Sequence, residues 1–224
     1  MKTVVLSLGG SLIVPDKIDI NFLKKFRKAI INFVKKGNRM IIVCGGGKTC
    51  RNYLNTAKKI TDISNKELDR LGIKSTELNA ELLRIIFGKY AYPEIQQDYN
   101  KKNLKFKILI SCGFLPGTSS DYDAVMWAKN YNADCIANLT DVDYVYTKDP
   151  GKYKDSKKLK DLDWKTMQKI VGKKWEAGLQ FPFDPIATKM AAKLKQKITF
   201  INPKNINNFR NFLDGKQFKG SVVY

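Results

Sequence analysis

The 224-residue sequence contains no histidine. This absence excludes Ser-His and Cys-His nucleophilic pairs, histidine metal ligands and histidine general bases together. Any chemistry must therefore proceed without a histidine. Phosphoryl transfer to an acceptor that is already an anion meets this condition, because it depends on positioning and charge neutralisation rather than on proton abstraction.

Cysteine is scarce, and its four residues form no C-x-x-C pair. With no histidine to complete a set of ligands, these cysteines do not indicate a zinc site. We expect free thiols that behave as small buried hydrophobic residues, and we identify no metal-ligating residue in the sequence. The four are Cys44, Cys50, Cys112 and Cys135.

Long apolar runs are absent as well. No stretch approaches the roughly 18 residues that a membrane-spanning helix needs. Glycines interrupt the start of the chain, where a signal peptide would have its apolar centre. Hydrophobic residues make up 43% of the sequence and are dispersed, which is typical of a globular protein. We expect one cytoplasmic domain over residues 1–224, without membrane association.

Acidic residues are outnumbered by basic ones, 21 to 41, which gives a formal charge of +20. Such an excess fits nucleic acid, a membrane surface or small anionic substrates as partners. Arginine, which is suited to bidentate phosphate and base contacts, contributes only six of the basic residues, and the lysines are spread along the chain. We therefore interpret the excess as a solvated lysine-rich surface and do not expect a nucleic-acid partner.

Short apolar segments alternate with amphipathic segments along the whole chain. We expect strands at 3–8, 39–44, 106–111, 134–139, 197–202 and 220–224. Capping residues and periodicity predict helices from Asp19 to Gly37, from Lys48, from Ser64 through Phe87, from about Asp121, from Asp184 through about Lys195, and near 205–213. The lysine-rich stretch 151–160 is interpreted as a solvated connection.

This alternation indicates an α/β fold with a mostly parallel central sheet that helices cover on both faces. No internal repeat or low-complexity linker interrupts the series. In such sheets, ligands bind at the carboxyl ends of the strands. Several glycine-rich or polar turns in this sequence follow directly after an expected strand.

The turn "CGGGKT" at residues 44–49 looks like the end of a nucleotide-binding P-loop, but it does not complete one. A P-loop needs a glycine five positions before Gly47, where Ile42 stands inside a strand. A dinucleotide-binding fingerprint beginning at Gly45 would need a third glycine in place of Cys50. The simplest alternative is a tight strand-to-helix turn.

A second glycine turn favours a ligand site over that alternative. Gly9-Gly10 and Gly45-Gly46-Gly47 both follow apolar strands, and both can present backbone N–H groups near a helix N-terminus. Lys48 and Arg51 add positive charge beside the second turn. We therefore predict a site for two phosphorylated ligands.

A third segment, "TDVDYVYTKDP" at 140–150, supplies groups that can hold a purine and a ribose. Thr140 offers a hydroxyl, Tyr146 a flat aromatic ring and Asp149 a carboxylate. An ordinary polar loop is the alternative interpretation of this segment.

Five motifs in order resemble the amino-acid kinase superfamily over essentially the whole chain, and most closely its archaeal-type uridylate (UMP) kinases. They are "SLGGSLIVPD", "VCGGGKTCRNYL", "LPGTSSDYDAV", "TDVDYVYTKDP" and "FDPIATKMAAKL". The resemblance implies a three-layer αβα sandwich that transfers the γ-phosphoryl group of Mg-ATP to UMP in pyrimidine nucleotide biosynthesis, within a hexamer. It also implies that the N-terminal part binds UMP and the C-terminal part binds ATP.

The resemblance further implies a role for individual residues. Those placed on the ATP phosphates are Ser7, Leu8, Gly9, Gly10, Ser11, Gly47 and Arg51. Thr140, Tyr146 and Asp149 would hold the adenosine. Gly46 would contact the UMP phosphate, and Asp69 would accept hydrogen bonds from the ribose hydroxyls. The residues that would wrap the uracil are Phe114, Leu115, Pro116, Gly117, Thr118, Ser119 and Ser120.

Three residues are the catalytic candidates. Asp121 would organise the catalytic lysines and magnesium, and Lys48 and Lys189 would neutralise charge on the transferred phosphoryl group. Each has a structural alternative: Asp121 is also a credible helix N-cap, and Lys189 could be one more surface lysine. Asp69 could likewise be a solvated helix residue.

The chain departs from the family pattern at several positions. Ser7 stands where many superfamily members have a lysine, although archaeal-type uridylate kinases often lack it too. Tyr144 occupies a turn position that is usually glycine, so a turn with positive φ would be strained or reshaped. Glu77 replaces a commonly basic residue, and Leu179, Gln180 and Phe181 replace a small, serine-rich stretch.

Other functions remain open from the residues alone. The isopentenyl phosphate kinase branch uses a histidine that this chain lacks. Kinases that form acyl phosphates on aspartate, glutamate or acetylglutamate share the ATP half, but Asp69 and the 114–120 loop favour a nucleotide acceptor. A non-catalytic nucleotide sensor or RNA-binding descendant is the alternative from another class.

Overall fold

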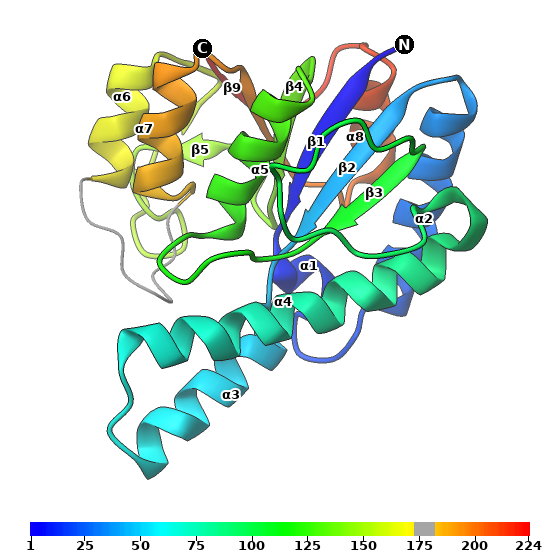
Figure 1. Cartoon of the computed structure of the whole chain (residues 1–224). Helices are drawn as coiled ribbons and strands as arrows, with labels where there is room; N and C mark the ends of the chain where they lie inside the picture. Colours follow the sequence, from blue (N-terminus) through cyan, green and yellow to red (C-terminus); the bar gives the residue numbers. More distant parts are fainter. Residues whose placement is uncertain (173–181) are drawn as a thin grey trace.

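The computed structural model describes residues 1–172 and 182–224, so the departures at Leu179, Gln180 and Phe181 lie outside the described residues. Figure 1 shows a twisted sheet between two layers of helices. Its seven strands are arranged in the order β3-β2-β1-β4-β8-β9-β7. Their bounds are β1 Thr3–Leu8, β2 Arg39–Cys44, β3 Ile108–Ser111, β4 Cys135–Leu139, β7 Asp161–Leu162, β8 Ile198–Ile201 and β9 Ser221–Val223.

The first five strands of that order run parallel to one another, from β3 to β8. Strand β9 pairs antiparallel with β8, and β7 pairs parallel with β9. The chain passes from β1 outward to β2 and β3 and then returns to β4 on the other side of β1. This reversal is the switch point at which open α/β sheets bind ligands. The mostly parallel sheet is confirmed.

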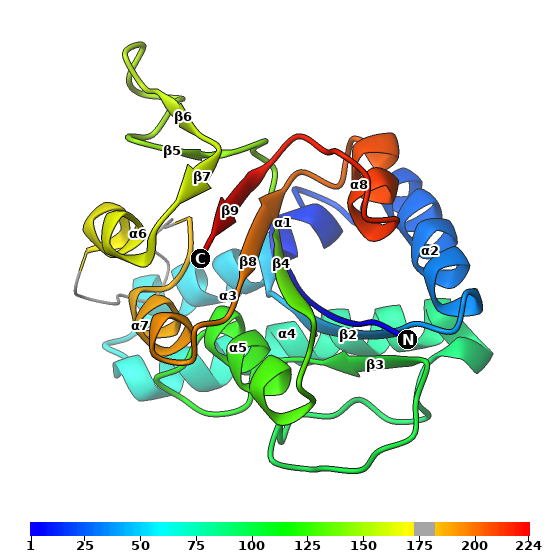
Figure 2. The ribbon, with the colours of Figure 1, turned by 90° about the horizontal axis from the view of Figure 1, so that it is seen from above.

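Helices cover both faces of the sheet (Figure 2). One layer contains α2 and α8 with part of α4, and the other contains α5, α6 and α7. The helices are α1 Gly10–Ile13, α2 Ile20–Lys35, α3 Gly47–Ile60, α4 Asn65–Phe87, α5 Ser120–Asn130, α6 Trp164–Val171, α7 Pro185–Lys193 and α8 Ile206–Leu213, with a 3-10 turn η1 at Gly88–Tyr90.

Side-chain alternation along the strands separates two hydrophobic cores. Val4, Leu6 and Leu8 of β1 pack under the α2 and α8 layer, whereas Val5 packs under the α5 to α7 layer. Ser7 falls on the α5 side because successive strand residues point to opposite faces. The alternation of side chains along β1 therefore directs the Ser7 hydroxyl toward α5.

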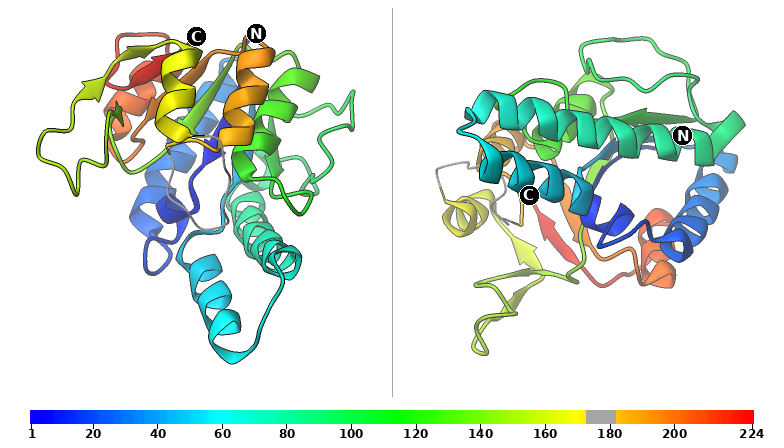
Figure 3. Two further views of the ribbon diagram at one scale, coloured as in Figure 1. Left: turned by 90° about the vertical axis from the view of Figure 1, so that its left-hand side faces the viewer. Right: turned by 90° about the horizontal axis from the view of Figure 1, so that it is seen from below.

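Helices α3 and α4 form a hairpin that extends beyond the carboxyl ends of the strands (Figure 3). The C-terminal half of α4 packs into the core through Ala80, Leu83 and Phe87. Its N-terminal half passes the strand ends and projects away from the sheet together with α3. The hairpin therefore forms one wall of the region where a ligand is expected.

Capping chemistry sets the helix starts that the sequence predicts. Asp19 accepts a hydrogen bond from the Phe22 N–H at 2.9 Å, and Ser64 accepts one from the Glu67 N–H at 3.3 Å. The predicted strands agree with the structure except at their ends; for example, 106–111 begins only at Ile108.

Two predictions about the middle of the chain need correction. The stretch 151–160 is not only a solvated connection, because Lys158–Leu159 forms strand β6, which pairs antiparallel with β5 (Val145–Tyr146). Helix α6 and strand β7 were not anticipated. Strand β7 has two residues, too few to show a periodicity in the sequence. Helix α6 has eight residues and a capping residue, Asp163, so its start could have been read from the sequence.

Candidate functional site

The two glycine turns lie against each other at the carboxyl edge of the sheet. Strands β1 and β2 pair in register from Thr3 opposite Arg39 to Leu8 opposite Cys44, so both strands end at the same level. A Cβ atom on Gly10 would lie 2.6 Å from the Gly45 carbonyl carbon and would also strike the Gly47 nitrogen. Only glycine allows this backbone approach, which brings the two predicted phosphate sites together.

The turns open into helices that lack a side-chain cap. Helix α1 follows Gly9 and helix α3 follows Gly46, and neither glycine can supply a capping oxygen. The first amides of a helix have no partner within the helix, so these are suited to an anion. Two of these amides are already paired, because the Leu12 N–H donates to the Gly9 carbonyl and the Lys48 N–H to the Val14 carbonyl, each at 2.9 Å.

Arg51 connects the second turn to the first. Its guanidinium donates to the Ser11 hydroxyl at 3.1 Å, across 40 residues of sequence. Lys48, one turn earlier on α3, is half-buried, and no carboxylate of the described ranges pairs with it. Three residues predicted at the ATP phosphates and at the reacting group thus occupy one region.

Asp121 is the centre of a hydrogen-bond network behind the turns. Its Oδ1 accepts from the Ser7 hydroxyl at 2.7 Å and from the Asn138 amide at 3.2 Å, and its Oδ2 accepts from the Asp184 N–H at 3.1 Å. Burial raises the pKa of Asp121 to about 6, and the Ser7 hydrogen bond partly offsets that rise. One carboxylate therefore joins β1, β4, α5 and the start of α7.

Asp121 does not cap its helix. The N-cap of α5 is Ser119, whose hydroxyl accepts from the Tyr122 N–H at 3.2 Å. The structural alternative for Asp121 is therefore wrong, and its carboxylate faces the glycine turns through Ser7. Ser7, the departure from the usual lysine, contributes a neutral donor to this carboxylate in place of a charged one.

Helix α7 brings Lys189 to the same side of the molecule. Asp184 caps this helix by accepting from the Ala187 N–H at 2.6 Å, while its own N–H reaches Asp121. Lys189 lies in the middle of α7 and its side chain is exposed. The structure places Lys189 on the helix that begins at the Asp121 network, and its catalytic role stays a prediction.

Asp69 contacts the loop that is predicted to wrap the uracil. Its Oδ2 accepts from the Gly117 N–H at 2.8 Å, across 48 residues of sequence. Asp69 is half-buried on α4, so it is not a freely solvated helix residue. Two predicted substrate residues are thus in direct contact.

The rest of the 114–120 loop is shaped by its own backbone. Leu115, Pro116 and Gly117 are exposed, and the Leu115 carbonyl accepts from the Thr118 hydroxyl at 2.7 Å. Gly117 has φ of +86°, a conformation that favours glycine. The Phe114 ring packs edge-on against Tyr99, with their centroids 5.3 Å apart.

Sequence reasoning missed three residues that hold the site together: one fixes the second glycine turn, and two fix the 113–117 loop. Asn79 is 3% exposed, and its amide donates to the Gly45 carbonyl at 2.7 Å and to the Gly46 carbonyl at 3.2 Å. A signal existed, because Asn79 interrupts the buried apolar stripe of α4 that Leu83 and Phe87 continue. The other two, Thr76 and Asp123, support the 113–117 backbone.

The predicted adenosine segment begins beside β8 and ends in an exposed local turn. Asp149 is exposed and accepts from the Gly151 N–H at 2.8 Å, only two residues away. Tyr146 lies on β5, and its ring meets Tyr144 edge-on at 6.4 Å. Thr140 directly follows β4, so its N–H reaches the Ile201 carbonyl at 3.2 Å.

Tyr144 does not strain this segment. Among the described residues, the only positive φ angles outside glycine belong to Asn103, Asn132 and Lys195. The loop has therefore adopted a shape that accepts a bulky residue, and the Lys158 ammonium lies 5.5 Å from the centroid of the Tyr144 ring. Of the two outcomes that the sequence left open, a reshaped loop is the one observed.

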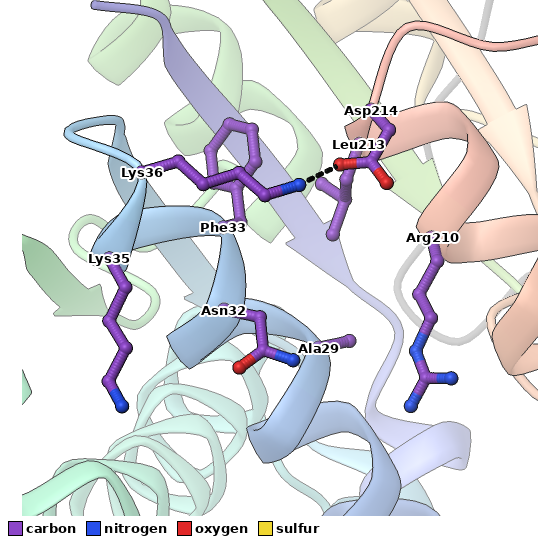
Figure 4. Close-up of a pocket in the computed structure, with 8 residues that line it drawn as sticks. All are labelled: Ala29, Asn32, Phe33, Lys35, Lys36, Arg210, Leu213 and Asp214. Atoms are coloured by element: carbon purple, nitrogen blue, oxygen red, sulfur yellow. Dashed lines mark hydrogen bonds and ion pairs between the residues drawn. The ribbon is translucent and has the colours of Figure 1, made fainter.

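A separate cavity of about 310 Å³ lies between α2 and α8 (Figure 4). The Lys36 ammonium spans its rim to Asp214 at 2.6 Å. None of the predicted site residues lines this cavity, whose residues are Ala29, Asn32, Phe33, Lys35, Lys36, Arg210, Leu213 and Asp214. The strand ends, and not this cavity, bring the predicted residues together.

Two features are absent from the described residues, a membrane-spanning helix and a cluster of metal ligands. No helix within 1–172 and 182–224 is long and apolar enough to cross a bilayer. Over the same residues, no three His, Cys, Asp or Glu side chains converge in a way that could hold a metal ion.

The fold and site define a class of protein: an α/β protein whose adjacent strand ends carry glycine turns suited to phosphorylated ligands. Comparison with known families is consistent with this class. The chain belongs to the amino acid kinase family, whose model matches residues 2–202.

Individual relatives cover nearly the whole chain. The sequence is 36% identical to the uridylate kinase of Sulfolobus acidocaldarius over 206 residues, 90% of each chain. It is 34% identical to that of Sulfurisphaera tokodaii over 225 residues, 98% of each chain. Among solved structures, it is similar to the uridylate kinase of Archaeoglobus fulgidus, with a TM-score of 0.82, 30% identity and full coverage of both chains. The three-layer αβα sandwich is confirmed.

Proposed function

We propose that the protein is a nucleoside monophosphate kinase that transfers the γ-phosphoryl group of ATP to UMP, giving ADP and UDP. The observation that carries this proposal is the backbone contact between the Gly9-Gly10 and Gly45-Gly46-Gly47 turns. Two phosphorylated ligands bound at turns in contact would meet phosphate to phosphate. The uridylate kinase names of relatives that match nearly the whole chain support UMP as the acceptor.

The proposed mechanism requires no general base. An oxygen of the UMP phosphate, already an anion, attacks the γ-phosphorus, and the bond from that phosphorus to the β,γ-bridging oxygen breaks as ADP leaves. The obstacle is repulsion between anions, so catalysis depends on alignment and on positive charge. Lys48, Lys189 and Arg51 supply the charge, and Asp121 fixes the elements around them. The absence of histidine is compatible with every part of this reaction.

We assign UMP to the N-terminal part and the adenosine of ATP to the C-terminal part, and the ATP phosphates lie on the N-terminal glycine turns where the two ligands meet. Gly46, Asp69 and the loop from Phe114 to Ser120 would hold UMP. The ATP phosphates would contact the turn from Ser7 to Ser11 together with Gly47 and Arg51, and the adenosine would lie against Thr140, Tyr146 and Asp149. Each of these assignments remains a proposal that mutagenesis must test.

Magnesium fits this donor set only in part. Both oxygens of Asp121 already accept protein hydrogen bonds. Mg²⁺ commonly keeps several waters and binds one or two carboxylates together with substrate phosphates. We therefore propose that the ion is held mainly by the nucleotide, with Asp121 beside it, and supplies further charge neutralisation there.

The cellular setting follows the same resemblance. We propose a cytoplasmic enzyme of pyrimidine nucleotide biosynthesis, because the reaction consumes ATP and produces UDP. A homo-oligomer, with a hexamer expected from the family, is part of the proposal.

The direct test is ADP release in the presence of Mg-ATP and a panel of acceptors: UMP, CMP, dUMP, AMP, aspartate, glutamate and acetylglutamate. We expect turnover with UMP, with UDP identified by chromatography, and no turnover with the amino acids. Lys48→Met, purified in the same way, controls for a contaminating kinase. ADP release with an amino acid but not with UMP would show an acyl-phosphate kinase. Salt-sensitive RNA binding without any turnover would indicate a non-catalytic descendant.

A further inference from the structure

Three backbone amides of the 113–117 segment donate to side chains from other elements. The Gly113 N–H donates to the Thr76 hydroxyl at 2.9 Å, and the Phe114 N–H donates to Asp123 Oδ2 at 3.3 Å. The third is the contact of the Gly117 N–H with Asp69. Two of the acceptors lie on α4 and one on α5. Side chains of α4 and α5 therefore hold the loop through its backbone amides, and among the described residues no neighbouring strand bonds to these three amides.

The Thr76 hydroxyl links the loop to the backbone of helix α4. Its hydroxyl accepts from Gly113 and donates to the Ile73 carbonyl at 2.7 Å. A Cβ on Gly113 would lie 3.2 Å from both the Ile73 Cγ1 and the Thr76 hydroxyl oxygen. The loop thus begins in close contact with α4, at a point that the Thr76 hydroxyl fixes.

Asp123 is an energetically costly residue to use as a support for a loop. Its side chain is fully buried, and of its two oxygens only Oδ2 has a partner within the described part of the chain. Burying an unpaired polar oxygen is costly, and an apolar residue of similar size would avoid that cost. Within the described ranges, the one hydrogen bond that the Asp123 side chain makes to another segment comes from the Phe114 amide.

The supported segment carries the residues that the proposed function assigns to the base. The tip, from Leu115 to Gly117, is exposed, and a glycine at position 117 would give an unanchored tip more accessible backbone conformations than any other residue. A loop that visits several conformations binds its ligand only in the competent one, so the apparent affinity falls with the population of that conformation. Anchors at both ends of such a tip raise that population.

We propose that Thr76 and Asp123 are positioning residues that hold the 113–117 segment in the conformation that receives the base of the acceptor nucleotide. This inference rests on the proposed function for the identity of the acceptor. Neither residue need touch the ligand. Their loss would weaken acceptor binding while leaving ATP binding and the chemical step nearly unchanged.

The test uses two substitution pairs in the full-length protein. Thr76→Val keeps the shape and removes the hydroxyl acceptor, and Thr76→Ser restores it. Asp123→Val removes the acceptor and also relieves the buried carboxylate, whereas Asp123→Asn keeps an oxygen for the Phe114 amide. The expected effect of each valine variant is a rise of roughly 3- to 10-fold in KM for UMP, the size of one lost hydrogen bond. KM for ATP and kcat should change less than twofold, and the Ser and Asn variants should recover most of the loss.

Matched controls come from the opposite edge of the sheet. The Thr3 hydroxyl accepts from the Arg39 guanidinium at 3.1 Å, and Asp134 accepts from the Thr3 N–H at 2.7 Å. Thr3→Val and Asp134→Val therefore remove comparable hydrogen-bond acceptors far from the loop. They should leave KM for UMP unchanged even where they lower thermal stability.

Hydrogen exchange measured by NMR provides a readout that does not depend on activity. Exchange of the Gly113 amide should quicken in Thr76→Val, and that of the Phe114 amide in Asp123→Val, by a similar 3- to 10-fold. Unchanged exchange, or equal rises in KM for UMP and ATP, would overturn the inference. If the wild-type protein shows no turnover with UMP while these amides respond as expected, the proposed function fails and the loop anchoring stands.

Discussion

Asp69 and Asp149 make the same contact in two different ways. Each carboxylate accepts a hydrogen bond from a glycine amide at 2.8 Å. The partner of Asp69 is Gly117, 48 residues away, whereas the partner of Asp149 is Gly151, two residues away. The first contact joins two elements, and the second closes a single turn. The loop assigned to the base of UMP is therefore held by a tertiary contact, whereas the turn that carries Asp149 is closed by a local one. The start of the adenosine segment differs from that turn, because Thr140 and Val145 bond to β8 and β9.

The difference extends to neighbouring residues. In the acceptor half, the Asn79 amide spans 34 residues to reach the Gly45 carbonyl, and the Gly113 amide spans 37 to reach Thr76. In the adenosine segment, Lys148 pairs with Asp155 and Ser156 donates to the Lys148 carbonyl. Long-range contacts resist local opening better than exposed turns do. We expect the acceptor half to be ordered before its ligand arrives and the adenosine segment to adjust when ATP binds.

The largest effect is expected from Gly10→Ala, because Gly10 lies where the first glycine turn contacts the second. The added Cβ would lie 2.6 Å from the Gly45 carbonyl carbon, and backbone atoms on both sides cannot move independently. We expect a loss of about 3 kcal/mol or more in the free energy of unfolding, with binding of both nucleotides impaired. Denaturant unfolding and nucleotide titration would measure the two effects.

Gly72→Ala is the control for that substitution. A Cβ at Gly72 meets only the Cys50 sulfur, at an ordinary 3.7 Å, within helix α4. Alanine favours a helix over glycine, so this variant should be more stable by roughly 0.5 to 1 kcal/mol. A Gly10→Ala protein as stable as the parent would show that the turns are not in backbone contact.

The next largest effect is expected from Lys189→Met. Methionine keeps the length and helix propensity of lysine, and the side chain is exposed, so stability should hardly change. Loss of a charge that acts on the transferred phosphoryl group should lower kcat about 100-fold, with KM values nearly constant. Lys193→Met, exposed one turn further along α7, is the matched control and should remain active. A fully active Lys189→Met would remove the residue from the catalytic set.

Asp123 gives the acceptor half a distinct response to pH. Burial raises the pKa of Asp123 to about 8, the Phe114 amide lowers it, and the Asp121 charge raises it further. The native state therefore keeps a proton that the unfolded chain releases near pH 4, so this residue makes the protein less stable as pH rises from about 4 to about 8. Asparagine does not ionise, so Asp123→Asn does not lose this stability as the pH rises. Its stability relative to wild type should increase by about 1 kcal/mol or more between pH 5 and pH 8, measured by urea unfolding.

The outcome that would contradict this expectation is specific. If the unfolding free energies of wild type and Asp123→Asn run parallel from pH 5 to pH 8, Asp123 is ionised in the native protein. Its carboxylate would then need a cationic or hydrogen-bonding partner for Oδ1 that the described residues do not provide.

The sequence predicted the parts of the molecule that rest on local rules. Short apolar runs located β1 and β2, helical periodicity located α2, and the capping residues Asp19, Ser64 and Asp184 marked helix starts that the structure confirms. The glycine turns were recognisable because only glycine fits such turns. The parallel sheet then placed them at one edge.

Other features depend on contacts that no local pattern encodes. The two-residue strands β6 and β7 form only because a neighbouring strand passes beside them. The roles of Thr76, Asn79 and Asp123 depend on which loop amide or carbonyl the fold brings within reach. A polar residue inside an apolar stripe signals burial, but its partner is defined only by the tertiary structure. Of the predicted adenosine residues, Asp149 needed no such information, because its partner Gly151 lies two residues away.

The smallest expected effects come from a matched pair that sharpens the opening comparison, Asp69→Asn and Asp149→Asn. Asparagine keeps a carbonyl oxygen for the glycine amide in both places and removes only the negative charge. Asp69→Asn should raise KM for UMP about 10-fold and leave KM for ATP unchanged, because a ribose hydroxyl bonds more strongly to a charged acceptor. Asp149→Asn should raise KM for ATP about 3-fold and leave KM for UMP unchanged.

The expected rise in KM is larger for Asp69→Asn than for Asp149→Asn because the two aspartates are held by different kinds of contact. Asp69 is fixed by a distant segment, so its carboxylate is already in place and a weakened contact cannot be recovered by movement. Asp149 lies in an exposed turn, where solvent screens its charge and the backbone can shift to restore a contact. Equal losses from the two substitutions, or an effect of Asp149→Asn on UMP, would show that the adenosine segment is as firmly ordered as the acceptor half before ligands bind.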